Sequence, residues 1–437
     1  MKKLYLLILS LVLLLAACNS DSGSTESSKE SSSNEEKSGE KIKIEYWHVN
    51  AETQGGKTVK KLVEDFNKQS DTVEVVEKYN PDMYKGLMQN LQAEIAGGNA
   101  PDLVQVGWSF KNYFNENFEY TPAQDIIDKH FEDDKTFLKD KFNENILELA
   151  QDEEGNQIGI PYSISTPVLY LNKDLLKEAG LSEEGPKTWE EVEEFSKTIK
   201  EKTDKYGIYI QEPADHWAQQ ALVESNDAKI IKDGKASFAD ENGIKAYEMY
   251  QKMVVKDQTA LHTGWDEGVQ NFIDGNVAML FTTIAQRTNV DSNAKFDATA
   301  VEMPEWKGKE RQIPAGGAML AITSKDDEKQ KATWEFMKYL YSVEGMAEWT
   351  KGTGYVPPRN DVADSPDGLK TFLEENEMMK PAIEQMDNVV RWVSFEGSNG
   401  LEAEQELLDM RDKILGGDVD VKKTMEDAQD KINELLK

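Results

Sequence analysis

Sulfur and imidazole are scarce in this chain. Cys18 is the only cysteine among 437 residues, and it lies close to the N-terminus. A disulfide within the body of the protein, a cysteine nucleophile and a thiolate metal site are therefore excluded. No two of the four histidines, His48, His130, His216 and His262, have the spacing of zinc ligands. We therefore expect neither a metal nor a cofactor.

Catalytic and nucleotide-binding motifs are also missing. The chain has no phosphate-binding loop, no glycine-rich dinucleotide fingerprint and no nucleophile elbow. Residues 291–302 have acidic residues at both ends, like a calcium loop, but Phe296 stands where glycine is needed. Because Asp and Glu number 82, any chosen pair of catalytic carboxylates is uninformative. We expect a binding protein and not an enzyme, with an anchored glycoside hydrolase as an alternative.

Positive charge is in short supply. Lys and Arg number 50 against 82 Asp and Glu, so the formal net charge is −32. This balance disfavours nucleic acid, whose phosphates need basic partners, and it disfavours anionic membrane surfaces. It says little about a small ligand, because the charge of a pocket and the total charge are separate quantities.

Long apolar runs are confined to the N-terminus. Lys2 and Lys3 precede an apolar run over residues 4–15, which is too short for a confident transmembrane span of roughly 20 residues. The basic start, short apolar core and small residues indicate a signal peptide over residues 1–17. Leu15-Ala16-Ala17-Cys18 resembles a bacterial lipobox, in which the cysteine is lipidated. We expect Cys18 to carry a diacylglycerol and palmitate; the alternative is an ordinary signal with a chance cysteine.

A polar segment follows this N-terminal signal. Residues 18–40 consist mainly of Ser, Glu, Lys, Asp, Gly and Asn and contain no aromatic residue. Such a segment cannot bury enough apolar surface to offset its ordering entropy, so we expect a disordered tether. The body would then lie on the extracytoplasmic face of the cell membrane.

The body begins at about Lys41 and is too large for one ordinary hydrophobic core, which predicts two lobes. Its first part alternates strands and helices, as is typical of an α/β fold. Ligands of such sheets bind at the carboxyl ends of the strands, so His48–Asn50 and Gly107–Ser109 are expected near a cleft. Strands are predicted over 42–48, 73–79 and 103–106, and helices over 57–70 and 84–95.

A long extended stretch with two prolines, residues 160–171, opens the second unit. Thr188-Trp189-Glu190-Glu191 is typical of a capping box at a helix start. The last helix repeats apolar residues from Val421 to Leu435 at a spacing that predicts one packed face. Residues 352–359 are expected to form a rigid turn region. Further strands are predicted over 206–210, 277–281 and 318–322, and helices over 173–179, 217–225, 241–256, 266–274 and 330–341.

Several modest motifs together resemble the extracellular solute-binding proteins of ABC importers, in the large carbohydrate-type family. They are Ile44-Glu45-Tyr46-Trp47-His48, Gly98-Asn99-Ala100-Pro101-Asp102-Leu103, Ile160-Pro161-Tyr162, Leu169-Tyr170-Leu171-Asn172-Lys173-Asp174, and Phe272 with Gly275, Ala278 and Met279. The resemblance covers nearly the whole body. It implies a two-lobe α/β clamp of the periplasmic-binding-protein type (type II), with discontinuous lobes, a hinge and a membrane permease as partner.

Within this family the pattern is most similar to the glycerol-3-phosphate-binding branch. The similarity lies in Ser165–Tyr170, Gly316-Gly317-Ala318 and Thr353–Pro357. That branch has an acidic residue at the position of Trp108, and an Arg where this chain reads Ser398 to Glu404 without one. These departures favour a neutral sugar over a phosphate. The ligand contacts that the resemblance implies are Tyr84, Ser165, Thr283, Gly317 and Tyr355.

Aromatic rings bind sugars because pyranose faces are apolar and stack on them, while hydroxyl groups need polar partners. The tryptophans Trp108, Trp217, Trp265 and Trp392 are therefore candidates, although packing in the core is the usual role of Trp. Gly316-Gly317 is either a plain turn or a close approach to a ligand. Asp215 and His216 lie either at the ligand or in a solvated loop. The predicted ligand-binding residues are Trp108, Tyr84, Ser165, Trp217, Trp265, Thr283, Gly316, Gly317, Tyr355 and Trp392.

Taken together, the sequence predicts a monomeric, lipid-anchored substrate-binding protein that captures a sugar or oligosaccharide and delivers it to a permease. Lobe 1 is expected over residues 41–161 and 304–350, and lobe 2 over 162–303 and 351–437. The alternatives are a glycerol-3-phosphate-binding or glycerophosphodiester-binding protein of the same class, and a glycoside hydrolase or sensor subunit.

Overall fold

The computed structural model describes residues 41–437, except 53–54, 153, 213–214 and 398. The predicted signal peptide, the lipidation site Cys18 and the tether therefore lie outside the described residues. Within the described part of the chain, no helix is both long enough and apolar enough to cross a membrane.

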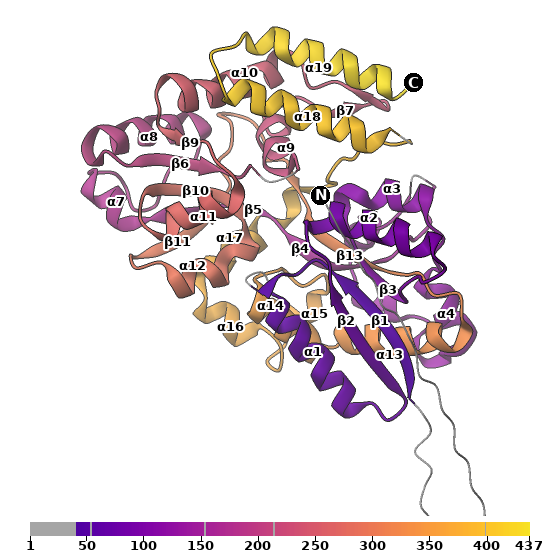
Figure 1. Ribbon diagram of the computed structural model, residues 1–437. Helices are drawn as coiled ribbons and strands as arrows, with labels where there is room; N and C mark the ends of the chain where they lie inside the picture. The colour runs from indigo at the N-terminus through magenta and orange to yellow at the C-terminus, as the bar shows by residue number, and fades with distance from the viewer. Residues whose placement is uncertain (1–40, 53–54, 153, 213–214, 398) are drawn as a thin grey trace, which may run out of the picture. The chain divides into compact units, whose positions relative to one another are not determined.

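One five-stranded sheet is built mainly from the first part of the chain (Figure 1). β1 runs parallel to both β2 and β3, while β13 is antiparallel to β3 and β4. The last two strands come from distant segments, so the chain leaves this sheet and returns to it. In spatial order the strands are β2 (Val73–Tyr79), β1 (Ile42–His48), β3 (Leu103–Gly107), β13 (Gly316–Ile322) and β4 (Ile160–Ser165).

Side chains of β1 are buried on both faces of this sheet. Ile44 and Tyr46 pack in a core with residues of α1 (Gly56–Gln69) and α13 (Asp327–Leu340). Trp47 lies in a different core with residues of α2 (Met83–Ala96). Successive side chains of a strand point to opposite faces, so α2 covers the face opposite to α1 and α13. Trp47 is a core residue.

The second five-stranded sheet has both parallel and antiparallel pairs. β10 is antiparallel to β5 and parallel to β6, and β11 is antiparallel to β5. The central strands β5 and β10 are buried along their whole length, whereas the edge strands β11 and β9 are short. In spatial order the strands are β11 (Ala298–Glu302), β5 (Pro167–Asn172), β10 (Val277–Thr283), β6 (Tyr206–Ile210) and β9 (Ala260–Leu261).

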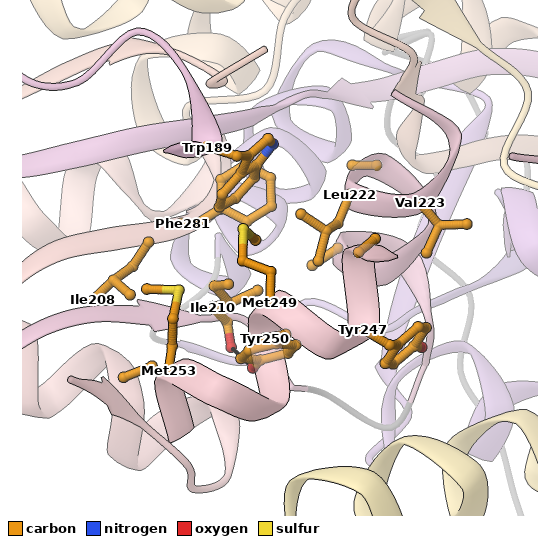
Figure 2. Packing of buried hydrophobic residues seen from close by; sticks show 14 of the residues in the cluster. Trp189, Ile208, Ile210, Leu222, Val223, Tyr247, Met249, Tyr250, Met253 and Phe281 are labelled. Atoms are coloured by element: carbon orange, nitrogen blue, oxygen red, sulfur yellow. Dashed lines mark hydrogen bonds between the residues drawn. The ribbon is translucent and has the colours of Figure 1, made fainter. Parts of the chain in front are cut away.

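A large apolar core lies against the second sheet. Figure 2 shows Trp189 of α8 (Trp189–Thr203) beside Phe281 of β10, and their rings meet edge to face at 5.2 Å. The capping box predicted at the start of α8 is present: the Thr188 hydroxyl accepts from the Glu191 backbone, and the Glu191 carboxylate accepts from the Thr188 backbone. This cap fixes the start of the helix and thereby the position of Trp189.

The chain passes from the first sheet to the second at Thr166, which lies between the end of β4 and the start of β5. Thr166 is fully buried, and its carbonyl accepts from the Ile284 backbone at 3.0 Å. The buried side chain of Gln385 donates to the Thr166 hydroxyl at 2.9 Å and to the Pro167 carbonyl at 2.7 Å. The crossing is therefore held by two other parts of the chain.

The remaining elements are short strands and helices. β12 (Ile313–Pro314) pairs with β14 (Val389–Val390), and β7 (Ile231–Lys232) pairs with β8 (Lys235–Ala236). The other helices are α3 (Lys111–Asn117), α4 (Ala123–His130), α5 (Phe137–Lys141), α6 (Glu144–Glu148), α7 (Lys173–Glu178), α9 (Trp217–Glu224), α10 (Glu241–Gln251), α11 (Trp265–Ile273), α12 (Arg287–Asn293), α14 (Val343–Thr353), α15 (Asn360–Ala363), α16 (Lys370–Glu375), α17 (Lys380–Glu384), α18 (Gly400–Leu415) and α19 (Val421–Leu435).

One local prediction and one alternative are wrong. Of the two alternatives for Gly316-Gly317, the plain turn is ruled out, because both residues begin β13 and pair with β4. The predicted turn region over 352–359 is helical in its first two residues, because α14 continues through Thr353 and ends with Gly354 in the left-handed conformation. The last helix, α19, does pack by one apolar face, as its spacing predicts; Figure 1 shows it beside α18.

Candidate functional site

A cavity of about 350 Å³ lies where strands of both sheets end or begin. Ser165 ends β4, Thr283 ends β10, and Gly316 and Gly317 begin β13. Gln211 and Glu212 directly follow β6. We call this space the main cavity. Its position agrees with the rule that ligands of α/β sheets bind outside strand ends.

Nine of the ten predicted ligand-binding residues line the main cavity. They are Tyr84, Ser165, Trp217, Trp265, Thr283, Gly316, Gly317, Tyr355 and Trp392. The tenth, Trp108, is buried and does not line this cavity; its indole Nε1 donates to the Gly316 carbonyl at 3.1 Å. Contact between any of these residues and a ligand stays a prediction.

The tryptophans of the main cavity are fixed by hydrogen bonds and packing. Trp217 donates from Nε1 to the Pro314 carbonyl at 2.9 Å, and its ring lies 6.2 Å from that of Trp392. Trp265 begins α11, is half-buried, and donates from Nε1 to the Thr282 hydroxyl at 3.2 Å. Each ring is therefore held in a fixed orientation, as stacking on a ligand requires.

The tyrosine at the cavity wall rests on a stack of rings. Tyr355 lies parallel to Trp349, with 5.6 Å between centroids and 2° between planes. Trp349 in turn stacks on Tyr162 at 4.8 Å. Burial raises the pKa of Tyr355 to about 12, so its hydroxyl stays protonated at neutral pH and can donate. Trp349 is fully buried and supports a cavity residue.

Gly316 and Gly317 are required by the packing of the protein itself. A Cβ at Gly316 would lie 2.4 Å from the Ser165 Oγ and 2.9 Å from the Trp217 ring. A Cβ at Gly317 would lie 2.1 Å from the Ser163 carbonyl oxygen, and its φ of 101° is one that side chains rarely allow. These glycines allow the close approach of β4 and Trp217, and their close approach to a ligand stays a prediction.

The wall of the main cavity is rich in carboxylates. Asp82, Glu212, Asp215 and Asp266 line it, and Lys85 is the one basic residue among the described residues that do so. Glu212 is buried and accepts a hydrogen bond from the Tyr250 hydroxyl at 2.5 Å and from His262 Nδ1 at 2.7 Å. The side chain of Glu212 is therefore held in place.

Asp215 and His216 do not lie in a solvated loop. Burial, with the nearby carboxylate of Glu404, raises the pKa of Asp215 to about 6. His216 is buried beside Asp215, and its Nδ1 contacts the Glu404 carboxylate. Burial lowers the pKa of His216, but the carboxylates of Glu404 and Asp215 outweigh it, so the net shift is upward. Glu404 is largely buried in this pair.

Residues near the N-terminus of α2 form a further part of the wall. Asp82 and Met83 both have positive φ, 61° and 53°, which is uncommon outside glycine. Such strained backbone tends to be kept at ligand sites.

Two residues that were expected near the cleft, His48 and Asn50, do not line the main cavity. His48 is buried, and its Nε2 lies 2.8 Å from the Glu77 carboxylate.

Ten lining residues were not among the predicted ligand-binding residues. Strand ends offer a signal for some: Ser109 and Phe110 follow β3, and Gln211 and Glu212 follow β6. The full set is Asp82, Met83, Lys85, Ser109, Phe110, Gln211, Glu212, Asp215, Gly264 and Asp266. Among the residues the structure describes, no group of three His, Cys, Asp or Glu is arranged to hold a metal ion.

Comparisons with known proteins identify the family of the chain. The family model for bacterial extracellular solute-binding proteins matches residues 61–378. The sn-glycerol-3-phosphate-binding periplasmic protein UgpB of Pectobacterium atrosepticum is 30% identical over 339 residues, which cover 72% of each chain. The corresponding UgpB of Escherichia coli (strain K12) is 28% identical over 361 residues, covering 79% of this chain and 80% of that one.

Solved structures show the same fold. UgpB from Mycobacterium tuberculosis, in complex with glycerophosphocholine, superposes with a TM-score of 0.80 at 20% identity, covering 90% of this chain and 98% of that one. Maltose-bound MalE3 of T. maritima superposes with a TM-score of 0.78 at 18% identity, covering 90% and 100%. The predicted two-lobe α/β fold is confirmed, as is the resemblance to the glycerol-3-phosphate-binding branch. The chain therefore belongs to the family of bacterial extracellular solute-binding proteins.

Proposed function

We propose that this protein is the lipid-anchored substrate-binding component of an ABC importer and that it captures a sugar or oligosaccharide in the main cavity. The observation that carries the proposal is the wall itself. Four aromatic residues, Trp217, Trp265, Trp392 and Tyr355, line the same space as the carboxylates. Hydrogen bonds hold Trp217 and Trp265, and ring stacking holds Tyr355. Apolar ring faces match the faces of a pyranose, and carboxylates accept hydrogen bonds from its hydroxyl groups.

Two features argue against a free phosphate in the main cavity. Its carboxylates outnumber its single lysine, so a dianion would meet net repulsion there. The segment from Ser398 to Glu404, where the resemblance places an arginine in the glycerol-3-phosphate-binding branch, contains none. A hydroxylated ligand without charge at this point avoids both costs.

A second candidate is a glycerophosphodiester with a cationic headgroup. It is favoured by the similar UgpB structure in complex with glycerophosphocholine and by the same wall, because aromatic rings and carboxylates together also stabilise a quaternary ammonium. In this case the headgroup would occupy the main cavity, and the phosphate would lie elsewhere.

The delivery step is proposed by analogy with the family. The two lobes, assigned to residues 41–161 with 304–350 and to 162–303 with 351–437, would close on the ligand, which contacts both. A ligand shifts that equilibrium only by its differential affinity for the closed form. The closed, monomeric protein would then dock on the permease, and the lipid on Cys18 would keep its local concentration high.

Calorimetric titration tests the ligand class. Maltose, maltotriose, glycerophosphocholine and glycerol 3-phosphate are each titrated into the protein, into a Trp265→Ala variant and into a Tyr79→Ala control. Tyr79 is an exposed aromatic residue outside the main cavity. We expect saturable heat with a saccharide, weakened by Trp265→Ala alone. Heat only with glycerophosphocholine would select the second candidate, and no heat with any of the four would overturn the proposal.

A further inference from the structure

Gln211 and Glu212, the two residues that directly follow β6, both line the main cavity. They are 5% and 8% exposed. The Gln211 N–H donates to the Phe281 carbonyl at 3.0 Å, and the Gln211 carbonyl accepts from the buried side-chain amide of Gln219 at 2.9 Å. The backbone is therefore fixed at this point, and an amide and a carboxylate stand side by side in the wall.

A chain of hydrogen bonds sets the orientation of the Gln211 amide. The Trp265 indole can only donate, and it donates to the Thr282 hydroxyl at 3.2 Å. That hydroxyl donates in turn to Gln211 Oε1. The amide oxygen is thus bonded to Thr282, whereas the two donors on Nε2 have no acceptor among the described residues. Because Gln211 lines the main cavity, these donors are available to a ligand there.

The Glu212 carboxylate is held by one donor on each oxygen. The hydroxyl of the fully buried Tyr250 donates to Oε1 at 2.5 Å, and His262 Nδ1 lies 2.7 Å from Oε2. The hydrogen bond to Glu212 raises the pKa of His262, which favours the form in which Nδ1 carries a proton. A carboxylate has about four acceptor sites, so each oxygen of Glu212 can accept one further hydrogen bond.

This pair of side chains suits uncharged groups that both donate and accept. An anionic oxygen would be repelled by Glu212, and an ammonium has no acceptor for the Gln211 donors. Two hydroxyl groups on neighbouring carbon atoms satisfy both side chains at once, since one donates to Glu212 and the other accepts from Gln211. Trp265, which is tied to Gln211 through Thr282, lines the same cavity and offers a ring face to the carbon skeleton.

We propose that Gln211 and Glu212 bind two neighbouring hydroxyl groups of one sugar ring and that Trp265 stacks on this ring. The inference rests on the proposed function and narrows it. The ligand is a saccharide whose ring at this part of the main cavity has two adjacent free hydroxyl groups, and a sugar substituted at either of them is rejected. Glu212 and Gln211 are thus specificity-determining residues.

Calorimetric titrations compare maltose and maltotriose with their monodeoxy analogues, each of which lacks one hydroxyl group. Glu212→Gln should weaken the parent saccharide about 10- to 100-fold, because a hydrogen bond to a charged acceptor is lost. Gln211→Glu keeps the acceptor for Thr282 but loses the donors, and should weaken it about 3- to 10-fold. Glu267→Gln makes the same charge change as Glu212→Gln on an exposed residue of α11 outside the main cavity and should have no effect.

The monodeoxy analogues identify which hydroxyl groups are bound. Two analogues that lack neighbouring hydroxyl groups should bind the wild type more weakly than the parent saccharide does. The analogue that lacks the hydroxyl bound to Glu212 should lose nothing further in Glu212→Gln, because the interaction is already absent.

The outcomes separate this inference from the proposed function. If every analogue binds the wild type as tightly as its parent, if the hydroxyl groups that matter are not neighbours, or if Glu212→Gln weakens all saccharides by the same factor, the inference is overturned while the proposed function stands. Binding of glycerophosphocholine without either saccharide selects the second candidate and also overturns the inference. If the wild type binds neither the saccharides nor the glycerol phosphates, both fall. The analogues decide on the wild type alone, even if a variant does not fold.

Discussion

Gly317→Ala should be among the most destabilising single-methyl additions in the first sheet. Two costs add at this position. An alanine at φ 101° is strained, by about 1–3 kcal/mol. Its Cβ would also lie 2.1 Å from the Ser163 carbonyl oxygen, so β4 would have to shift, at about 1–3 kcal/mol more. The expected loss in the free energy of unfolding is therefore about 2–6 kcal/mol.

Gly308→Ala isolates the first of these costs. Gly308 also has positive φ, 77°, but a Cβ there would meet no atom within 4 Å. Its variant should lose only about 1–2 kcal/mol. Urea unfolding, followed by tryptophan fluorescence, gives both values from the midpoint and slope. If Gly317→Ala costs no more than Gly308→Ala, then the strand contact is not what requires glycine, and the reasoning from close packing is refuted.

Three further outcomes are expected. Trp265→Ala should raise the Kd for a saccharide about 5- to 30-fold, because the ligand loses contact with one ring face. The effect on protein stability should be small, because Trp265 is half-buried and begins α11. Equal Kd values for the variant and the wild type in a titration would contradict this. Burial raises the pKa of Asp215 in the folded state to about 6, whereas in the unfolded chain it is about 4. The free energy of unfolding that this group contributes therefore decreases as the pH rises from about 4 to about 6. Asp215→Asn should therefore flatten that fall and raise the urea midpoint at pH 7 relative to the wild type; an unchanged pH profile would count against it. Thr188→Ala should cost about 1 kcal/mol in the same urea assay, because the capping box is lost, and an unchanged midpoint would mean that the cap does not stabilise α8.

The local pattern of the chain was enough to predict much of the fold. Apolar alternation predicted β1, and helical spacing predicted α1 and α2 within a few residues. These features depend on side chains a few positions apart, so sequence spacing alone reveals them. The resemblance contributed Ser165, Thr283 and Tyr355, which do line one cavity although they lie in distant segments.

Features that depend on long-range contacts escaped prediction. Glu404 contacts His216 across 188 positions, so an apparently exposed glutamate on α18 is largely buried. The role of Gly317 follows from the backbone of β4, which no local pattern reveals. Asp82 lines the main cavity and has a positive φ, which the sequence does not predict for a residue other than glycine.

The crossing at Thr166 limits how the two halves of the protein can move. The Gln385 amide is bonded at once to the Thr166 side chain and to the next carbonyl, and a third segment bonds the Thr166 backbone. Backbone torsion cannot change freely at a residue whose hydroxyl and carbonyl are both hydrogen-bonded to other segments. Bending must therefore be taken up by residues on either side, and Gln385, which does not line the main cavity, would govern how stiff the joint is.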